Sequence, residues 1–238
     1  MIGPLLVAIS WILLRIEGRK ISVLGFDKPQ QRSIEFLSGF TVAAVFAAGQ
    51  LLLVGWFSGF SWMLNPDLTV SVVLEGLSWN VNSVLFEELI FRGYLLYKAI
   101  ELWGPKRACL LSAAAFGVYH WFSQGVFGQL VPMVYLFMMT GLFGLMLAYA
   151  FERSKSVVLP VALHLGWNLV SIFVFSNGPI GSQLFIPAIS EPTMMSGLEQ
   201  SVVSILLPVT LPVLVLWVIV RRIDRYRHGG VSLAMTEP

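Results

Sequence analysis

The sequence predicts an all-α protein, built as a bundle of transmembrane helices. Of its 238 residues, 57% are hydrophobic and 12% are charged, and the mean hydropathy is +0.80. A soluble globular domain carries roughly one-quarter charged residues. Several apolar segments approach or exceed the ~20 residues that a helix needs to cross the hydrocarbon layer, and only helices or closed barrels can span that layer. These segments are continuous rather than alternating, which selects helices.

About seven spans are predicted, and polar breaks separate them. The apolar runs cover residues 2–15, 34–57, 70–100, 107–122, 131–151, 157–176 and 201–220. The first run has no basic residue before it and no small-residue cleavage site, so we expect a retained helix rather than a signal peptide. The third run is too long for one simple span. We expect it to be tilted or to end in a turn at the membrane interface.

The lysine and arginine residues predict how the bundle is oriented. Cytoplasmic loops near span ends carry an excess of these residues. They follow the first, third, fifth and seventh runs, whereas the connections 58–69, 123–130 and 177–200 contain none. The N-terminus is therefore expected outside and the C-terminus in the cytoplasm. Arg92 is the one basic residue that lies away from a predicted cytoplasmic end.

Charge and cysteine content exclude several other classes of function. The net charge of +2 is explained by membrane orientation, and no basic patch interleaved with aromatic residues indicates a nucleic-acid partner. Cys109 is the single cysteine. The chain can therefore form neither an intramolecular disulfide nor a cysteine-based metal site.

The third run contains three charged residues, Glu87, Glu88 and Arg92. An ionisable group deep in lipid costs at least ~2.5–3.5 kcal/mol, so such groups usually face a bundle interior and have a partner. Glu88 and Arg92 are spaced i, i+4 on one helix face and can pair. Glu87 is turned ~100° around the helix and has no obvious opposite charge. One carboxylate can thus be structural while the other is free for chemistry.

Two further motifs place histidines inside the predicted bundle. His120 follows Phe116 by four residues, and Asn168 follows His164 by four, so each pair shares a helix face. At ~1.5 Å per residue from the cytoplasmic helix ends, Glu87, His120 and Asn168 lie ~18–21 Å deep and His164 ~12 Å deep. We expect these side chains to meet in one cavity.

These residue types suit more than one kind of chemistry. A carboxylate beside an imidazole can deprotonate a water molecule, and a second imidazole with an amide can donate hydrogen bonds to an oxyanion. Alternatively, Glu87, His120 and His164 have the ligand types of a zinc site with an open position for water. Each motif taken alone is also compatible with a role in helix packing. The residues themselves leave these alternatives open.

Together, the three motifs resemble those of the CPBP (Abi) family of intramembrane proteases, which includes the type II CAAX prenyl endopeptidases. EELIFR at 87–92 matches EExxxR, FGVYH at 116–120 matches FxxxH, and HLGWN at 164–168 matches HxxxN. The resemblance implies a catalytic core at 70–176. N-terminal transmembrane helices and their loops would occupy 1–69, and 177–238 would form a non-cytoplasmic loop, the last helix and a cytoplasmic tail.

The resemblance also implies roles for individual residues. Glu87 and His120 would activate a water molecule, and His164 and Asn168 would stabilise the tetrahedral intermediate. Structural support would come from the remaining motif residues, Glu88, Arg92 and Phe116. The family is often labelled metalloprotease, but we prefer a metal-free glutamate mechanism that needs no cofactor, with zinc as the alternative.

We therefore expect an intramembrane endopeptidase that is a multi-pass protein of a bacterial cytoplasmic membrane. Its expected partners are the lipid bilayer and a membrane-associated protein or peptide substrate, with CAAX-type prenylated proteins as one candidate class. Two other functions stay open. One is a non-catalytic immunity or scaffold protein of the same family. The other is a transporter in which Glu87, His120 and His164 relay protons, although the chain lacks paired inverted segments broken by Gly or Pro.

Overall fold

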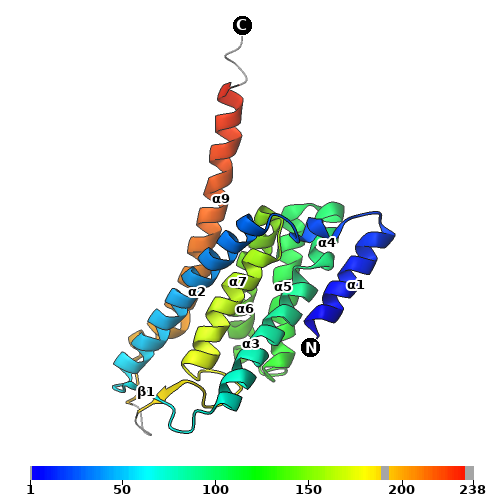
Figure 1. Ribbon diagram of the computed structural model, residues 1–238. Coiled ribbons are helices and arrows are strands. Elements are labelled where there is room, and N and C mark those ends of the chain that lie inside the picture. Colours follow the sequence, from blue (N-terminus) through cyan, green and yellow to red (C-terminus); the bar gives the residue numbers. More distant parts are fainter. Residues whose placement is uncertain (1, 189–192, 234–238) are drawn as a thin grey trace.

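The computed structural model describes residues 2–188 and 193–233 and is mostly helical, as predicted (Figure 1). Its α-helices are α1 (Gly3–Ile16), α2 (Pro29–Phe57), α3 (Val70–Phe91), α4 (Tyr94–Trp103), α5 (Pro105–Ser123), α6 (Leu130–Ser154), α7 (Val158–Asn168), α8 (Gly197–Ser201) and α9 (Leu207–Leu233). A 3₁₀ turn covers Ile21–Leu24, and π-helical segments cover Leu169–Val174 and Val202–Leu206. The end of the predicted cytoplasmic tail, 234–238, lies outside the described residues, as do 189–192 of the predicted loop at 177–200.

Among the described residues, three helical segments are long and apolar enough to cross a membrane. They are Ile21–Phe57, Leu130–Ser154 and Gly197–Ile219. Two shorter apolar helical segments cover Gly3–Ile16 and Val158–Val174. The chain is therefore an integral membrane protein, and the count of seven spans and the orientation of the termini stay predictions.

The long third run is divided into two helices by a turn. Arg92 directly follows α3 with φ −125°, and Gly93 precedes α4 with φ −84° and ψ −137°. A Cβ atom on Gly93 would lie 2.1 Å from the carbonyl oxygen of Leu89, so the turn requires glycine. Of the two expectations for this run, the structure therefore shows the turn.

A small antiparallel sheet joins two distant connections. Strand β1 (Trp62–Leu64) pairs with β2 (Phe185–Pro187), with Met63 opposite Ile186. The sheet places the connection 58–69 and the described start of the connection 177–200, which both lack lysine and arginine, at one end of the bundle (Figure 1). The sequence did not predict these strands, because each has only three residues and they pair across more than 100 residues of chain.

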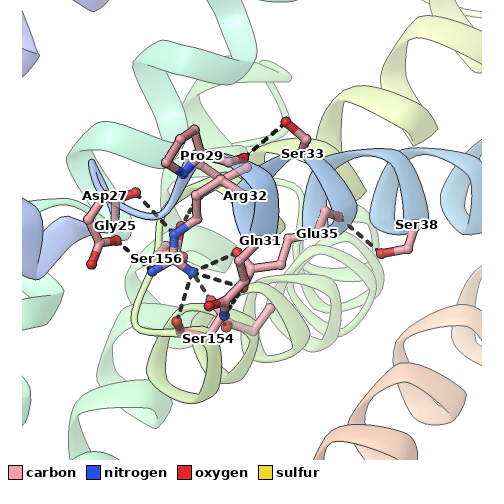
Figure 2. A network of polar contacts seen from close by, with 12 residues as sticks. Gly25, Asp27, Pro29, Gln31, Arg32, Ser33, Glu35, Ser38, Ser154 and Ser156 are labelled. Carbon is pink, nitrogen blue, oxygen red and sulfur yellow. Dashed lines mark hydrogen bonds and ion pairs between the residues drawn. The ribbon is translucent and has the colours of Figure 1, made fainter.

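The start of α2 lies at the end of the bundle away from the sheet (Figure 1), and Arg32 fastens it there through the contacts shown in Figure 2. Its guanidinium donates to Asp27 Oδ1 at 2.8 Å and to Glu35 Oε1 at 2.8 Å. It also donates to the carbonyl oxygens of Gly25 at 3.1 Å and Ser154 at 3.2 Å. The end of α6 is thereby tied to the start of α2, so Arg32 is a structural residue as well as a basic residue of a predicted cytoplasmic loop.

Glycine allows α2 to lie directly against α7, the helix that carries the HxxxN motif. A Cβ atom on Gly166 would lie 2.4 Å from the carbonyl oxygen of Phe40 on α2. Side chains of α6, α7 and α9, with Ala43 of α2, form one buried apolar cluster beside this contact. The position of α7, and with it that of His164, is therefore fixed by close helix packing.

Candidate active site

A fully buried ion pair joins Glu88 and Arg92. Arg92 Nη1 donates to Glu88 Oε1 at 3.0 Å, and both side chains are 0% exposed. The second guanidinium nitrogen, Nη2, donates to the carbonyl oxygen of Gly144 on α6 at 3.1 Å. The guanidinium also lies over the ring of Phe116 on α5, 4.2 Å from its centroid. Arg92 therefore links α3, α5 and α6 around one buried charge.

His164 contacts the same carboxylate from α7. Its Nδ1 lies 2.8 Å from Glu88 Oε1, and its Nε2 lies 3.2 Å from Asn168 Nδ2. A carboxylate accepts hydrogen bonds, so these partners assign the proton to Nδ1 and leave Nε2 as an acceptor in the neutral ring. Glu88 thereby fixes both the tautomer and the orientation of His164.

Glu87 differs from Glu88 in having no hydrogen bond among the described residues, and its one contact with a basic side chain is longer. It is 8% exposed, and its Oε2 atom is buried with no hydrogen-bond partner among the described residues. The nearest opposing group is His164 Nε2, at 3.9 Å from Oε2, which is too long for a hydrogen bond. An unsatisfied buried carboxylate is costly, and such groups are often found at catalytic sites.

His120 is held by its own helix. Its Nδ1 lies 2.8 Å from the carbonyl oxygen of Phe116, which can only accept, so Nδ1 carries the proton and Nε2 is an acceptor. The ring of Phe116 packs against both imidazoles, with centroid distances of 4.5 Å to His120 and 6.0 Å to His164. Phe116 therefore sets the spacing of the two histidines.

The two histidines and Asn168 line one cavity of about 160 Å³. Its other lining residues are Phe116, Met139, Thr140, Phe143, Trp167 and Pro208. Pro208 comes from α9, far from the three motifs in sequence. The cavity thus combines the polar groups of α5 and α7 with an apolar wall from α6, α7 and α9.

The structure brings the predicted site residues close to one another, but Glu87 is not among the residues that line the cavity with His120, His164 and Asn168. Two contacts also differ from the expected ones. The Glu88–Arg92 pair is present, but His164 also hydrogen bonds to Glu88. His120 makes no hydrogen bond to Glu87, which faces His164 instead. Sequence reasoning missed the carbonyl of Gly144 and the side chain of Pro208, because neither belongs to a motif with a chemical signature.

The arrangement does not favour the zinc alternative. In the part of the chain that the structure describes, no three His, Cys, Asp or Glu side chains are grouped so that they could hold a metal ion. His164 directs Nδ1 to Glu88 and Nε2 to Asn168. The three proposed ligands, Glu87, His120 and His164, therefore have suitable donor atoms for zinc but not a suitable arrangement.

The fold and the site define an integral membrane protein with a buried cluster of carboxylates, imidazoles and an amide next to a cavity. Residues 69–170 match the family model described as type II CAAX prenyl endopeptidase Rce1-like. All three motifs lie inside this match. The predicted relation of this segment to the CPBP family of proteases is thereby confirmed. Comparison with curated proteins and with solved structures gave no significant match.

Proposed function

We propose that the protein is a multi-pass intramembrane endopeptidase of a bacterial cytoplasmic membrane. Its substrates would be membrane-associated proteins, with CAAX-type prenylated proteins as one class. The observation that carries this proposal is the free carboxylate of Glu87, 3.9 Å from an imidazole that Glu88 holds in place. The match to a protease family supports peptide hydrolysis as the reaction.

Glu87 acts as the general base in the proposed reaction. It takes a proton from water while the water oxygen forms a bond to the carbonyl carbon of the substrate, and the carbonyl oxygen becomes an oxyanion. His120 accepts a hydrogen bond from the same water at Nε2 and orients it. The intermediate then breaks its C–N bond, and the proton on Glu87 passes to the leaving nitrogen. The products are a carboxylic acid and an amine.

Asn168 and His164 stabilise the oxyanion in this scheme. An amide nitrogen has two N–H donors, and Asn168 uses one of them toward His164 Nε2. The other is available to the oxyanion. His164 supports this role through Nε2, which accepts the hydrogen bond from Asn168 and orients the amide toward the oxyanion. A preorganised donor of this kind contributes ~10²–10³ in rate.

Cleavage of membrane-anchored peptides tests the proposal. The purified protein is incubated in detergent with prenylated and non-prenylated peptides, and products are identified by mass spectrometry. We expect Glu87→Gln and His120→Ala to lower the rate by at least ~10², the lower end of the range for general base catalysis. Glu75→Gln is the control, because Glu75 is exposed on the same helix and accepts a hydrogen bond from Ser71. Cleavage that both site variants leave unchanged would defeat the assignment. Proton-driven uptake into vesicles without a peptide product would favour a transporter.

Metal analysis separates the two forms of the chemistry. We expect purified, active protein to contain less than one equivalent of zinc and to keep its activity after prolonged chelation, because the three proposed ligands are not grouped around one point. The measurements are elemental analysis and the cleavage rate before and after dialysis against chelator. Activity that disappears on chelation and returns with zinc would overturn the metal-free mechanism.

A further inference from the structure

The helix that supplies Pro208 to the cavity begins irregularly. The π-helical segment Val202–Leu206 directly precedes α9, and Pro208 is the second residue of α9. Pro208 lines the same cavity as His120, His164 and Asn168. The position of the 202–208 segment therefore decides how much room there is beside the reactive groups.

Pro208 deprives two carbonyl groups of a helical donor. The N–H of residue 208 would bond to the carbonyl of residue 204 in an α-helix and to that of residue 203 in a π-helix. Proline has no N–H. The neighbouring N–H, of Leu207, donates to the carbonyl of Val202. The carbonyls of Val203 and Ser204 are consequently left for donors from elsewhere.

Side chains from two other helices supply those donors. Gln50 Nε2 of α2 donates to the carbonyl oxygen of Val203 at 2.7 Å. Tyr135 Oη of α6 donates to the carbonyl oxygen of Ser204 at 2.6 Å. A backbone carbonyl without a partner is costly in lipid, because no water is present to donate to it. These two side-chain bonds therefore fasten the broken start of α9 to both neighbouring helices.

We propose that Gln50 and Tyr135 are positioning residues that hold Pro208 as a wall of the substrate cavity. This inference rests on the proposed function and adds a specificity to it. Besides the histidines and Asn168, the cavity is lined by apolar side chains, among them Met139, Phe143, Trp167 and Pro208. An apolar cavity of ~150 Å³ accepts a benzene-sized group. The substrate residue beside the scissile bond accordingly carries an apolar side chain no larger than a phenyl-containing one.

Hydrogen exchange tests the positioning role without relying on activity. The variants are Tyr135→Phe and Gln50→Leu, and amide exchange of residues 202–212 is followed by mass spectrometry in detergent. We expect roughly tenfold faster exchange in each variant, because a local opening that loses one hydrogen bond becomes easier. Tyr149→Phe is the matched control, since the Tyr149 hydroxyl on the same helix makes no hydrogen bond within the described part of the chain. Exchange equal to wild type in both variants overturns the positioning role.

A double variant tests whether Pro208 creates the need for Tyr135. Pro208→Ala restores an N–H that can bond to the carbonyl of Ser204. Tyr135→Phe should therefore accelerate exchange in the wild-type background but not in the Pro208→Ala background. Equal acceleration in both backgrounds would overturn this explanation of the Tyr135 bond.

Substrate preference tests the specificity role. We compare kcat/KM for a peptide with leucine beside the scissile bond with kcat/KM for the same peptide with tryptophan there. The leucine-to-tryptophan ratio should fall several-fold in Tyr135→Phe and Gln50→Leu, mainly through KM. Faster exchange with an unchanged ratio overturns the specificity role and leaves the hydrogen bonds as structural. A wild type that cleaves no peptide overturns the proposed function, whereas the exchange measurements would still decide the positioning role.

Discussion

Adjacent residues on one helix have opposite surroundings at the centre of the site. Glu88 is fully buried and accepts hydrogen bonds from both Arg92 and His164. Glu87, the preceding residue, is 8% exposed and has no ion-pair partner closer than the 3.9 Å to His164. A rotation of ~100° around the helix, the step from one residue to the next, thus separates a structural carboxylate from one that is free to react.

This difference predicts opposite effects of two matched substitutions. Glu88→Gln leaves Arg92 buried without its counterion, and breaking a buried pair in this way costs ~3–5 kcal/mol. Glu87→Gln removes an unpaired buried charge, so we expect the protein to be as stable as wild type or more stable. Thermal unfolding in detergent measures both. A similar loss of stability in the two variants would contradict the division of roles.

The sequence predicted the Glu88–Arg92 pair because the i, i+4 spacing fixes it within one helix. It did not predict which glutamate meets His164, because that contact depends on how α3 and α7 are rotated about their axes. The carbonyl of Gly144 was equally out of reach, since every residue has a carbonyl group and only the packing of α6 shows which one accepts from Arg92. Within-helix contacts were thus predictable, and contacts between helices were not.

Helix α6 packs closely against Phe116 and Arg92 at Gly144. A Cβ atom there would lie 2.9 Å from Phe116 Cδ1 and 3.0 Å from Arg92 Nη2. Gly144→Ala should therefore cost ~1–3 kcal/mol, as overpacking of a core does. Gly141→Ala, one turn earlier, is the control, because the nearest atom to its Cβ is the carbonyl oxygen of Ala113 at 3.8 Å. If unfolding temperatures fall equally in the two variants, close packing at Gly144 is not the cause.

Helices α1 and α4 are joined by a polar cluster around Glu17, which directly follows α1. Tyr94 Oη donates to Glu17 Oε1 at 2.6 Å, and Lys98 Nζ lies 2.9 Å from the same oxygen. The hydrogen bond from Tyr94, followed by the contact with Lys98, holds the pKa of Glu17 below its ordinary value of 4.5. The folded state therefore favours the ionised form. This contribution to stability is present above the unfolded pKa and is lost as the pH falls through the folded pKa.

The polar cluster between α1 and α4 predicts how the stability of the protein depends on pH. Glu17→Gln should lower the unfolding temperature most at ~pH 6 to 7, and the gap to wild type should narrow as the pH falls below ~4, where the wild-type carboxylate also loses its charge. Differential scanning fluorimetry of both proteins across this range provides the measurement. A gap that stays constant from ~pH 7 to ~pH 3 would show that the ionised form of Glu17 is not what joins the helices.

Two independent features of the whole molecule agree on which connections lie together. The positions of the lysine and arginine residues predict that connections 58–69 and 177–200 lie on the same side, because both lack basic residues. The pairing of β1 with β2 brings the same two connections into contact, although backbone hydrogen bonds carry no information on charge. Charge bias acts through the membrane and strand pairing acts within the chain. Their agreement supports placing the two connections on the same side of the membrane, and the cytoplasmic position of the basic connections stays a prediction.

Cysteine labelling of intact cells tests that topology as a whole. In a Cys109→Ala background, Asp67→Cys and Ser182→Cys each place one exposed thiol near the sheet, and Lys155→Cys places one between α6 and α7. We expect a membrane-impermeant maleimide to label positions 67 and 182 in intact cells, and position 155 only after permeabilisation. Labelling of position 155 alone in intact cells would reverse the predicted orientation but keep the fold, because 67 and 182 would still behave alike. Labelling of only one of the two paired connections would contradict the β1–β2 pairing itself, since strands in one sheet cannot lie on opposite sides of a bilayer.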